Sequence, residues 1–191
     1  MLYKYNDIVK IEGNVRKARA AINSKYIKVA PGIYSTDETN YVDHLVVFFI
    51  RYKTLTITMQ TAFEYYDFTD INYEKYTLAF IQGYRKINNP LIKQSYINSD
   101  IYYLGREKIN KDGFDLYIYN RERLLIELIR NKAKLPYDYY KEIVNSYRTL
   151  VKEDEINLSK VIDYCQHFNH SEKLIQLIQE IILWHLKRRL D

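Results

Sequence analysis

The sequence predicts an α+β protein in which a small N-terminal segment precedes a larger domain with a small antiparallel or mixed sheet and a helical C-terminal half. Three observations indicate this fold class. A basic helical segment and a Pro-Gly hairpin lie near the N-terminus, short strand-like runs occupy the middle of the chain, and helical periodicity dominates after Asn120. Strands followed by helices are typical of α+β domains. We expect segments at 1–36, 37–53 and 54–191, the second of them a bridging helix.

Two short helices separated by a glycine are predicted at the start of the chain. Tyr5–Glu12 has apolar residues at helical spacing, and Gly13 follows where the backbone needs a residue that tolerates positive φ. Asn14–Ser24 is predicted as a second, amphipathic helix. Its expected apolar face consists of Val15, Ala18 and Ile22.

The opposite face of this second helix has the composition of a DNA-contacting surface. Arg16, Arg19 and Asn23 line it, and the small Ala20 lies between them. In a DNA major groove, arginine suits the O6 and N7 atoms of guanine, and asparagine suits the N6 and N7 atoms of adenine. We therefore expect this helix to enter the groove.

A tight hairpin is predicted after the second helix. Its strands are Tyr26–Val29 and Ile33–Ser35, and its turn is Ala30-Pro31-Gly32, with proline and glycine in the positions typical of a type II turn. Two helices followed by such a hairpin have the layout of a winged helix, here a minimal one that lacks the usual preceding helix. The expected DNA-binding residues are Asn14, Arg16, Lys17, Arg19, Ala20, Asn23, Lys25 and Lys28, with Ala30, Pro31 and Gly32 as the wing turn.

The net charge of the chain is concentrated in this N-terminal segment. Residues 1–30 contain seven of the 29 lysines and arginines but only two of the 24 acidic residues, so the remaining chain holds 22 of each sign. The whole formal excess of +5 therefore lies on the predicted winged helix. Such asymmetry is typical of nucleic-acid binding, although a solvated basic surface without a ligand would have the same charge.

The rest of the chain is predicted as a helix, then strands, then helices. Asp37–Arg51 has helical apolar spacing behind a capping sequence at Thr36-Asp37-Glu38, and we expect it to cover the apolar face of the winged helix. The elements expected beyond it are strands at 55–58, 76–81, 91–97, 101–109 and 114–118, and helices at 60–68, 121–133, 136–150, 158–168 and 171–190. Lys111-Asp112-Gly113 is expected to form a hairpin turn.

Composition indicates a cytoplasmic protein. Cys165 is the single cysteine, which excludes an internal disulfide and suits a reducing compartment. The sequence has no apolar run of the length of a membrane span, and its first residues are too polar for a secretory signal.

Four segments together resemble the AbiEi-type antitoxins of bacterial abortive-infection, or type IV toxin–antitoxin, systems. They are the hairpin sequence KYIKVAPGIYS, the strand and helix ITMQTAFEYYDFTD, the helix start YIYNRERLLIELIRN, and NLSKVIDYCQHF in the helical tail. They occur in the family's order and span nearly the whole chain. Asp67 stands where the family usually has glycine, and Leu125 replaces a usual threonine.

The resemblance implies a DNA-binding antitoxin that represses its own operon and counteracts a nucleotidyltransferase-like toxin of the AbiEii type. Repression implies binding to double-stranded DNA at the protein's own promoter, at inverted repeats, whereas the toxin is counteracted without a stable complex. The alternative is a protein-interaction module whose degenerate winged helix no longer contacts DNA. Membrane association is not expected.

Other chemistry has less support in the sequence, and we expect no catalytic residue, cofactor or metal. Cys165, His167 and His170 have the side chains of a zinc site but match no closed four-ligand spacing. Neither a phosphate-binding glycine loop nor a nucleophile elbow is present. The strands place tyrosines near Lys93, Arg106 and Lys108, which could stack single-stranded bases, but tyrosine at the rim of an amphipathic sheet is the favoured interpretation.

Overall fold

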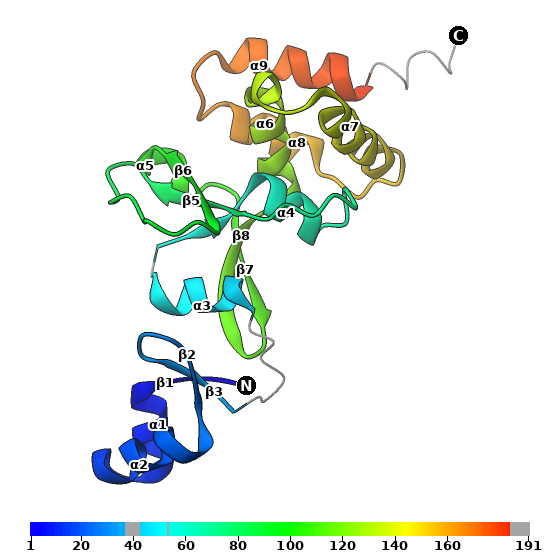
Figure 1. Ribbon diagram of the computed structural model, residues 1–191. Helices are drawn as coiled ribbons and strands as arrows, with labels where there is room; N and C mark the ends of the chain where they lie inside the picture. Colours follow the sequence, from blue (N-terminus) through cyan, green and yellow to red (C-terminus); the bar gives the residue numbers. More distant parts are fainter. Residues whose placement is uncertain (37–42, 53, 184–191) are drawn as a thin grey trace. The chain divides into compact units, whose positions relative to one another are not determined.

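The computed structural model of the chain describes residues 1–36, 43–52 and 54–183 (Figure 1). The chain divides into two compact units. The first contains Met1–Lys53 and Asn110–Asp115, and the second contains Thr54–Ile109 and Leu116–Asp191. Both units contain helices, and their strands form two small sheets. This agrees with the predicted α+β class.

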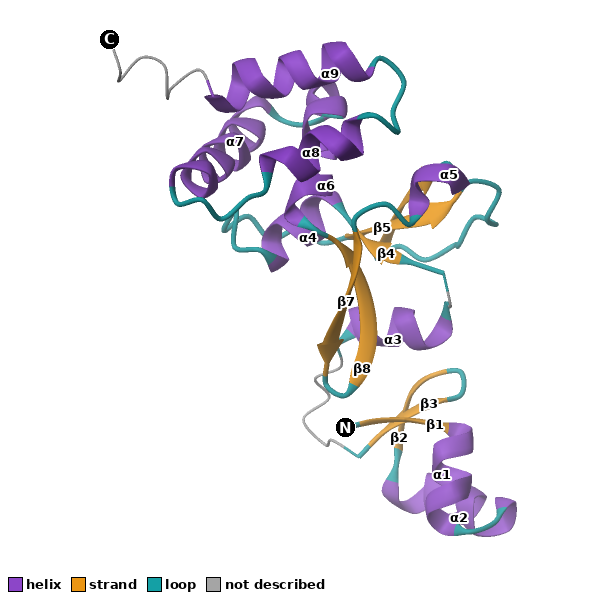
Figure 2. Cartoon of the chain, turned by 180° about the vertical axis from the view of Figure 1, so that it is seen from behind, coloured by secondary structure: helices purple, strands orange, loops and turns teal. Residues whose placement is uncertain are grey.

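The first unit has a three-stranded antiparallel sheet with two helices inserted between its first and second strands (Figure 2). Strand β3 is central, in the order β1-β3-β2, and Tyr3 of β1 pairs with Tyr34 of β3. The sequence did not predict β1, because three residues are too few to show alternation. The elements are β1 (Leu2–Lys4), α1 (Tyr5–Glu12), α2 (Val15–Lys25), β2 (Ile27–Ala30), β3 (Ile33–Ser35) and α3 (His44–Arg51).

The core of the first unit differs from the predicted apolar face of α2. Ala18 and Ala21 are buried, whereas Val15 is 47% exposed and Ile22 is half-buried. Two alanines on the buried face let α1 and α2 approach closely, and Ile8 of α1 is fully buried. The prediction that Val15 is a core residue is therefore wrong.

Helix α3 begins later than predicted. Asp43 has an extended backbone, and its side chain accepts hydrogen bonds from the backbone N–H groups of Leu45 at 2.8 Å and Val46 at 3.4 Å. The helix therefore starts at His44 rather than at Asp37. The predicted cap residues Asp37 and Glu38 lie outside the described residues, as does Lys53.

The second unit has a five-stranded mixed sheet. Its order is β6-β5-β4-β8-β7; β5 runs parallel to β6, β4 runs parallel to β8, and β4 runs antiparallel to β5. The strands are β4 (Thr56–Ile57), β5 (Tyr76–Ile81), β6 (Ile92–Ile97), β7 (Arg106–Lys111) and β8 (Phe114–Tyr119). The strand predicted over Ile101–Ile109 is wrong in its first half, because Asn98 caps a short helix there, and β7 begins only at Arg106.

Helices α6 to α9 gather on one side of the second unit (Figures 1 and 2). Three of the predicted helices end earlier than expected, at Tyr65, Arg130 and Cys165, and the part of the last one beyond Leu183 lies outside the described residues. The helices are α4 (Met59–Tyr65), α5 (Ser99–Tyr102), α6 (Arg121–Arg130), α7 (Tyr137–Lys152), α8 (Leu158–Cys165) and α9 (Ser171–Ile178), which continues as a π-helix over Gln179–Leu183. A 3₁₀ turn at Lys132–Lys134 precedes α7.

Tyrosines belong to the core of the second unit rather than only to its rim. Tyr102, Tyr119 and Tyr147 are fully buried, and each hydroxyl donates a hydrogen bond. Burial raises the pKa of all three side chains above the ordinary value for tyrosine. The predicted rim position is therefore wrong for Tyr102 and Tyr119, which lie in or directly beside predicted strands. The hydroxyls of all three tyrosines are satisfied inside the protein.

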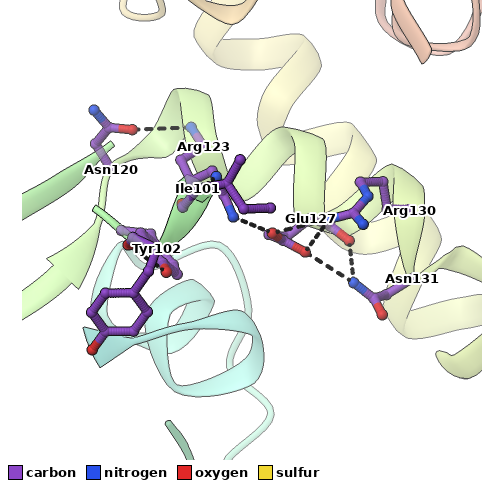
Figure 3. A network of polar contacts seen from close by, with 8 residues as sticks. Ile101, Tyr102, Asn120, Arg123, Glu127, Arg130 and Asn131 are labelled. Carbon is purple, nitrogen blue, oxygen red and sulfur yellow. Dashed lines mark hydrogen bonds and ion pairs between the residues drawn. The ribbon is translucent and has the colours of Figure 1, made fainter. Parts of the chain in front are cut away.

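A buried ion pair lies at the centre of the second unit (Figure 3). The Arg123 side chain is fully buried and donates to Glu127 Oε1 at 2.7 Å and to the backbone carbonyl of Ile101 at 3.1 Å. Glu127 also accepts hydrogen bonds from Arg130 and Asn131. The guanidinium carbon of Arg123 lies 4.9 Å from the ring centre of Tyr119 and 4.6 Å from that of Phe168. This pair connects α6 to α5, β8 and the end of α8.

A glycine allows the chain to pass close to this pair. Gly105 has φ +70°, and a Cβ atom there would lie 2.5 Å from Cβ of Arg123 and 2.9 Å from Oδ1 of Asn120. The Gly105 carbonyl also accepts a hydrogen bond from the Asn120 N–H at 2.8 Å. Gly83 has a similar backbone, with φ +88°, but a Cβ atom there would meet nothing within 4 Å.

We predict that Gly105→Ala destabilises the protein much more than Gly83→Ala. Both substitutions place a side chain in the left-handed region, which costs about 1–2 kcal/mol. Only Gly105→Ala also forces apart the packed Arg123 and Asn120, which adds about 1–3 kcal/mol. Urea denaturation of the two variants measures the difference, and equal losses would show that the close approach at Gly105 is unimportant.

We predict that Glu127→Ala lowers the free energy of unfolding by about 3–5 kcal/mol, because it leaves the buried Arg123 guanidinium without its carboxylate. Arg130→Ala is the matched control. The Arg130 side chain is 42% exposed and reaches solvent, so its removal costs about 1 kcal/mol or less. The double variant Arg123→Met/Glu127→Leu removes both charges and is expected to recover most of the loss. A double variant no more stable than Glu127→Ala would contradict the assignment of the loss to an unpaired charge.

Candidate nucleic-acid interface

Helix α2 presents a polar, basic surface that is held in place by a cap at its first turn. Asn14 precedes the helix with an extended backbone, and its Oδ1 atom accepts a hydrogen bond from the Lys17 N–H at 2.9 Å. Gly13, at φ +84°, ends α1 in the left-handed conformation that the sequence predicted for the turn. Asn14 is therefore the N-cap residue of α2.

One exposed face of α2 consists of Arg16, Arg19, Ala20 and Asn23, which all belong to the predicted DNA-binding set. Ala18 and Ala21 point into the unit, which leaves the side chains three and four residues apart on the other side of the helix open to solvent. All eight members of the predicted set are exposed, including Asn14, Lys17, Lys25 and Lys28. Lys25 follows Ala18 by seven residues, so it lies on the side of the helix that carries the two buried alanines.

Lys25 has a carboxylate neighbour within the unit. Its Nζ atom lies 3.8 Å from Oε1 of Glu12, which comes from the end of α1. Both groups lie at the surface, where such pairs contribute little and exchange readily with other ions. Lys25 can therefore reach a phosphate only by giving up this weak pair. Within the described residues, no ion pair involves Arg16, Lys17 or Arg19.

The hairpin after α2 has the predicted turn. Pro31 and Gly32 connect β2 to β3, Gly32 has φ +75°, and Ala30 pairs with Ile33. Strand β2 covers Ile27–Ala30, one residue later than predicted. The Gly32 carbonyl accepts a hydrogen bond from the Tyr5 N–H at 3.1 Å, which ties the turn to the start of α1. Lys28 is exposed on β2.

Two apolar side chains on the helices were not predicted to be exposed. Ile11 of α1 is 60% exposed and Val15 of α2 is 47% exposed, on either side of the Gly13 turn. The sequence placed Val15 in the core because it falls at helical spacing with Ala18. Spacing alone does not show which way the whole helix is rotated against its neighbour.

The arrangement can donate hydrogen bonds and positive charge to an anionic polymer. Arginine and asparagine side chains on one helix face offer bidentate donors for base edges, and lysines beside them offer contacts to phosphates. The other residues considered for site chemistry do not assemble: among the described residues, no group of three His, Cys, Asp or Glu side chains could hold a metal ion. None of the helices in the described part of the chain has both the length and the apolar character of a membrane span.

We predict that Asn14→Ala lowers the stability of the first unit by about 1 kcal/mol, because the α2 N–H at Lys17 loses its acceptor. Asn14→Ser keeps a capping oxygen and is expected to leave the stability nearly unchanged. Hydrogen exchange of the α2 amides compares the three proteins. Equal protection in the alanine variant would show that the cap is dispensable.

No protein-family model matches this chain, and no curated protein is significantly similar to it.

Proposed function

We propose that the first unit is a minimal winged helix that binds double-stranded DNA through α2. The observation that supports this most is the order β1-α1-α2-β2-β3 with β3 central in the sheet, together with an α2 face on which basic residues and Asn23 are exposed. A helix of this kind, placed after a short turn and before a hairpin, is the element that such domains insert into the major groove.

In this proposal, bases and phosphates are contacted by different residues. Arg16, Arg19 and Asn23 face base edges, where their side chains form bidentate pairs with guanine and adenine. Lys17 and Lys25 contact phosphates beside the groove, and Lys28 does so from the hairpin. The confinement of the chain's excess charge to residues 1–30 supports this assignment, because phosphate contacts dominate the affinity for DNA.

We further propose that the protein is an antitoxin that represses its own operon and counteracts a nucleotidyltransferase-like toxin. The support is the resemblance of four ordered segments to the AbiEi-type antitoxins, combined with the DNA-binding proposal for the first unit. One departure from that family is compatible with it: Asp67 has φ +56°, so the chain adopts at this position the left-handed backbone that glycine favours.

We predict that Arg19→Ala weakens binding to the protein's own promoter by about 1–3 kcal/mol and relaxes its sequence preference. Lys28→Ala is expected to weaken binding to all sequences alike. It should also reduce the slope of log affinity against log salt concentration by about 1, which corresponds to the loss of one phosphate contact. Lys173→Ala, a change of an exposed lysine on α9, is the control and leaves both properties unchanged. Gel shifts with promoter and scrambled duplexes, at several salt concentrations, measure these effects. Promoter binding without salt dependence would contradict the proposal.

The antitoxin role is tested separately from DNA binding. A neighbouring reading frame that encodes a nucleotidyltransferase-like protein should arrest growth when expressed alone, and co-expression of this chain should restore growth. Rescue by the Arg16→Ala/Arg19→Ala variant would show that antitoxicity does not require the DNA-binding face. A neighbour of another class, or arrest that this chain does not relieve, would contradict the antitoxin role.

A second candidate function is a protein-interaction module, and the exposed pair Ile11 and Val15 favours it. Apolar side chains exposed beside a turn are typical of protein contacts rather than of DNA contacts. Absence of a promoter gel shift, together with a stable complex that Ile11→Ser disrupts, would support this alternative instead.

A further inference from the structure

A second candidate binding surface lies in the second unit, where β5 is joined to β6. The two strands are parallel and adjacent, so residues 82–91 must return along the whole length of the strands, and they do so without a helix. The Gln94 side chain fixes this connection. Its Oε1 atom accepts from the Ile87 N–H at 2.6 Å, and its Nε2 atom donates to the Arg85 carbonyl at 3.4 Å.

The return connection and one face of β6 enclose a cleft of about 350 Å³. Ile92, Gln94 and Tyr96 alternate along β6 and form one side, and Lys86–Pro90 form the other. This volume is within the range of small-molecule sites and suits one nucleotide rather than a duplex. Strand β6 is the edge of the sheet, and it lies on the side of the unit away from α7 (Figures 1 and 2).

The segment that forms the cleft has a local excess of basic residues. Residues 75–99 include Lys75, Arg85, Lys86 and Lys93 and no aspartate or glutamate, and Glu74 and Asp100 directly flank this range. All four side chains are exposed, and none forms an ion pair with a carboxylate among the described residues. Residues 31–191 as a whole hold equal numbers of basic and acidic residues, so their net charge does not reveal this local excess. A local excess of positive charge attracts a polyanion at long range.

An exposed aromatic ring lies at the edge of the cleft. Tyr96 is 46% exposed, whereas Tyr102, Tyr119 and Tyr147 are buried in the core. In the described part of the chain, the Tyr96 ring packs against no other aromatic ring. An exposed ring beside cations offers a stacking platform for a base, and the side-chain amide of Asn88, which lines the same cleft, adds hydrogen-bonding groups.

We propose that this cleft binds single-stranded nucleic acid, with one base stacked on Tyr96 and the phosphates beside Arg85 and Lys86. An acidic peptide added to the edge of β6 would use the positive charge but would need neither the flat ring nor the amide. A base followed by its phosphate uses all three groups. The site belongs to the second unit and is independent of the duplex-binding face proposed for α2.

The test measures fluorescence anisotropy of labelled 12-nucleotide single strands, one RNA and one DNA, with the full-length Arg16→Ala/Arg19→Ala variant as the parent protein. That background suppresses binding by α2. Tyr96→Ala is expected to weaken binding roughly 5- to 100-fold, which is the usual effect of removing one stacking platform. Tyr96→Phe retains the ring and is expected to bind like the parent. Comparison of the two oligonucleotides separates RNA from DNA as the preferred strand.

The charge is tested with a second pair of variants. Lys86→Ala is expected to weaken binding several-fold and to reduce its dependence on salt. Tyr137→Ala, on α7, is the matched control for Tyr96→Ala, because Tyr137 is 72% exposed and remote in sequence from the cleft, and it is expected to have no effect. Circular dichroism and urea denaturation confirm that each variant is folded. In the otherwise unsubstituted chain, promoter duplex binding should survive Tyr96→Ala.

Three outcomes would overturn the proposal. The first is no binding of either single strand by the parent protein at low salt. The second is equal affinity of the parent and the folded Tyr96→Ala variant. The third is binding of a glutamate-rich peptide that depends on Lys86 while the oligonucleotides do not bind, which would identify the cleft as a site for acidic peptides. Loss of promoter binding in α2 variants alone would leave the proposal for the cleft intact.

Discussion

The buried pair of Arg123 and Glu127 is the interaction on which the second unit depends most. A guanidinium removed from water is tolerated only where it is paired and hydrogen-bonded. Glu127 of the same helix and the Ile101 carbonyl supply that environment (Figure 3). The rings of Tyr119 and Phe168 complete it. These contacts fix the position and the rotation of α6 within the second unit. Because Gly105 has no Cβ atom, its segment can pass close to Arg123 and Asn120.

This central network separates the structural role of α6 from the surfaces that could bind partners. Arg123 is fully buried, whereas the first two residues of α6 form ion pairs with neighbouring elements. Arg121 lies 3.1 Å from Glu155, which precedes α8, and Glu122 lies 3.6 Å from Lys160 of α8. Arg106 also makes its contacts within the protein. Its guanidinium lies over the Tyr117 ring and donates a hydrogen bond to Thr56. Basic side chains that are open to a polyanion include those on α2 and around the β6 cleft.

Local sequence patterns were sufficient where a short segment determines its own conformation. The bounds of α1, β3 and β5 agree with prediction, as do the left-handed backbones at Gly13 and Gly32. The exposed face of α2 also followed from helical spacing. The predicted strand over Ile101–Ile109 failed because β-branched and aromatic residues favour strands on average, whereas the Asn98 cap and the burial of Tyr102 under the sheet favour a helical turn.

The sequence by itself determined the fold class, the concentration of charge in residues 1–30 and most of the turns, because charge and turn preferences are properties of neighbouring residues. Only the tertiary structure decided that Val15 faces outward, that β1 completes the first sheet and that Tyr96 borders a cleft beside Lys86. Each of these depends on residues far apart along the chain, or on the rotation of an element against its neighbours. Tertiary packing determines these distant contacts and rotations, so a local sequence pattern does not predict them.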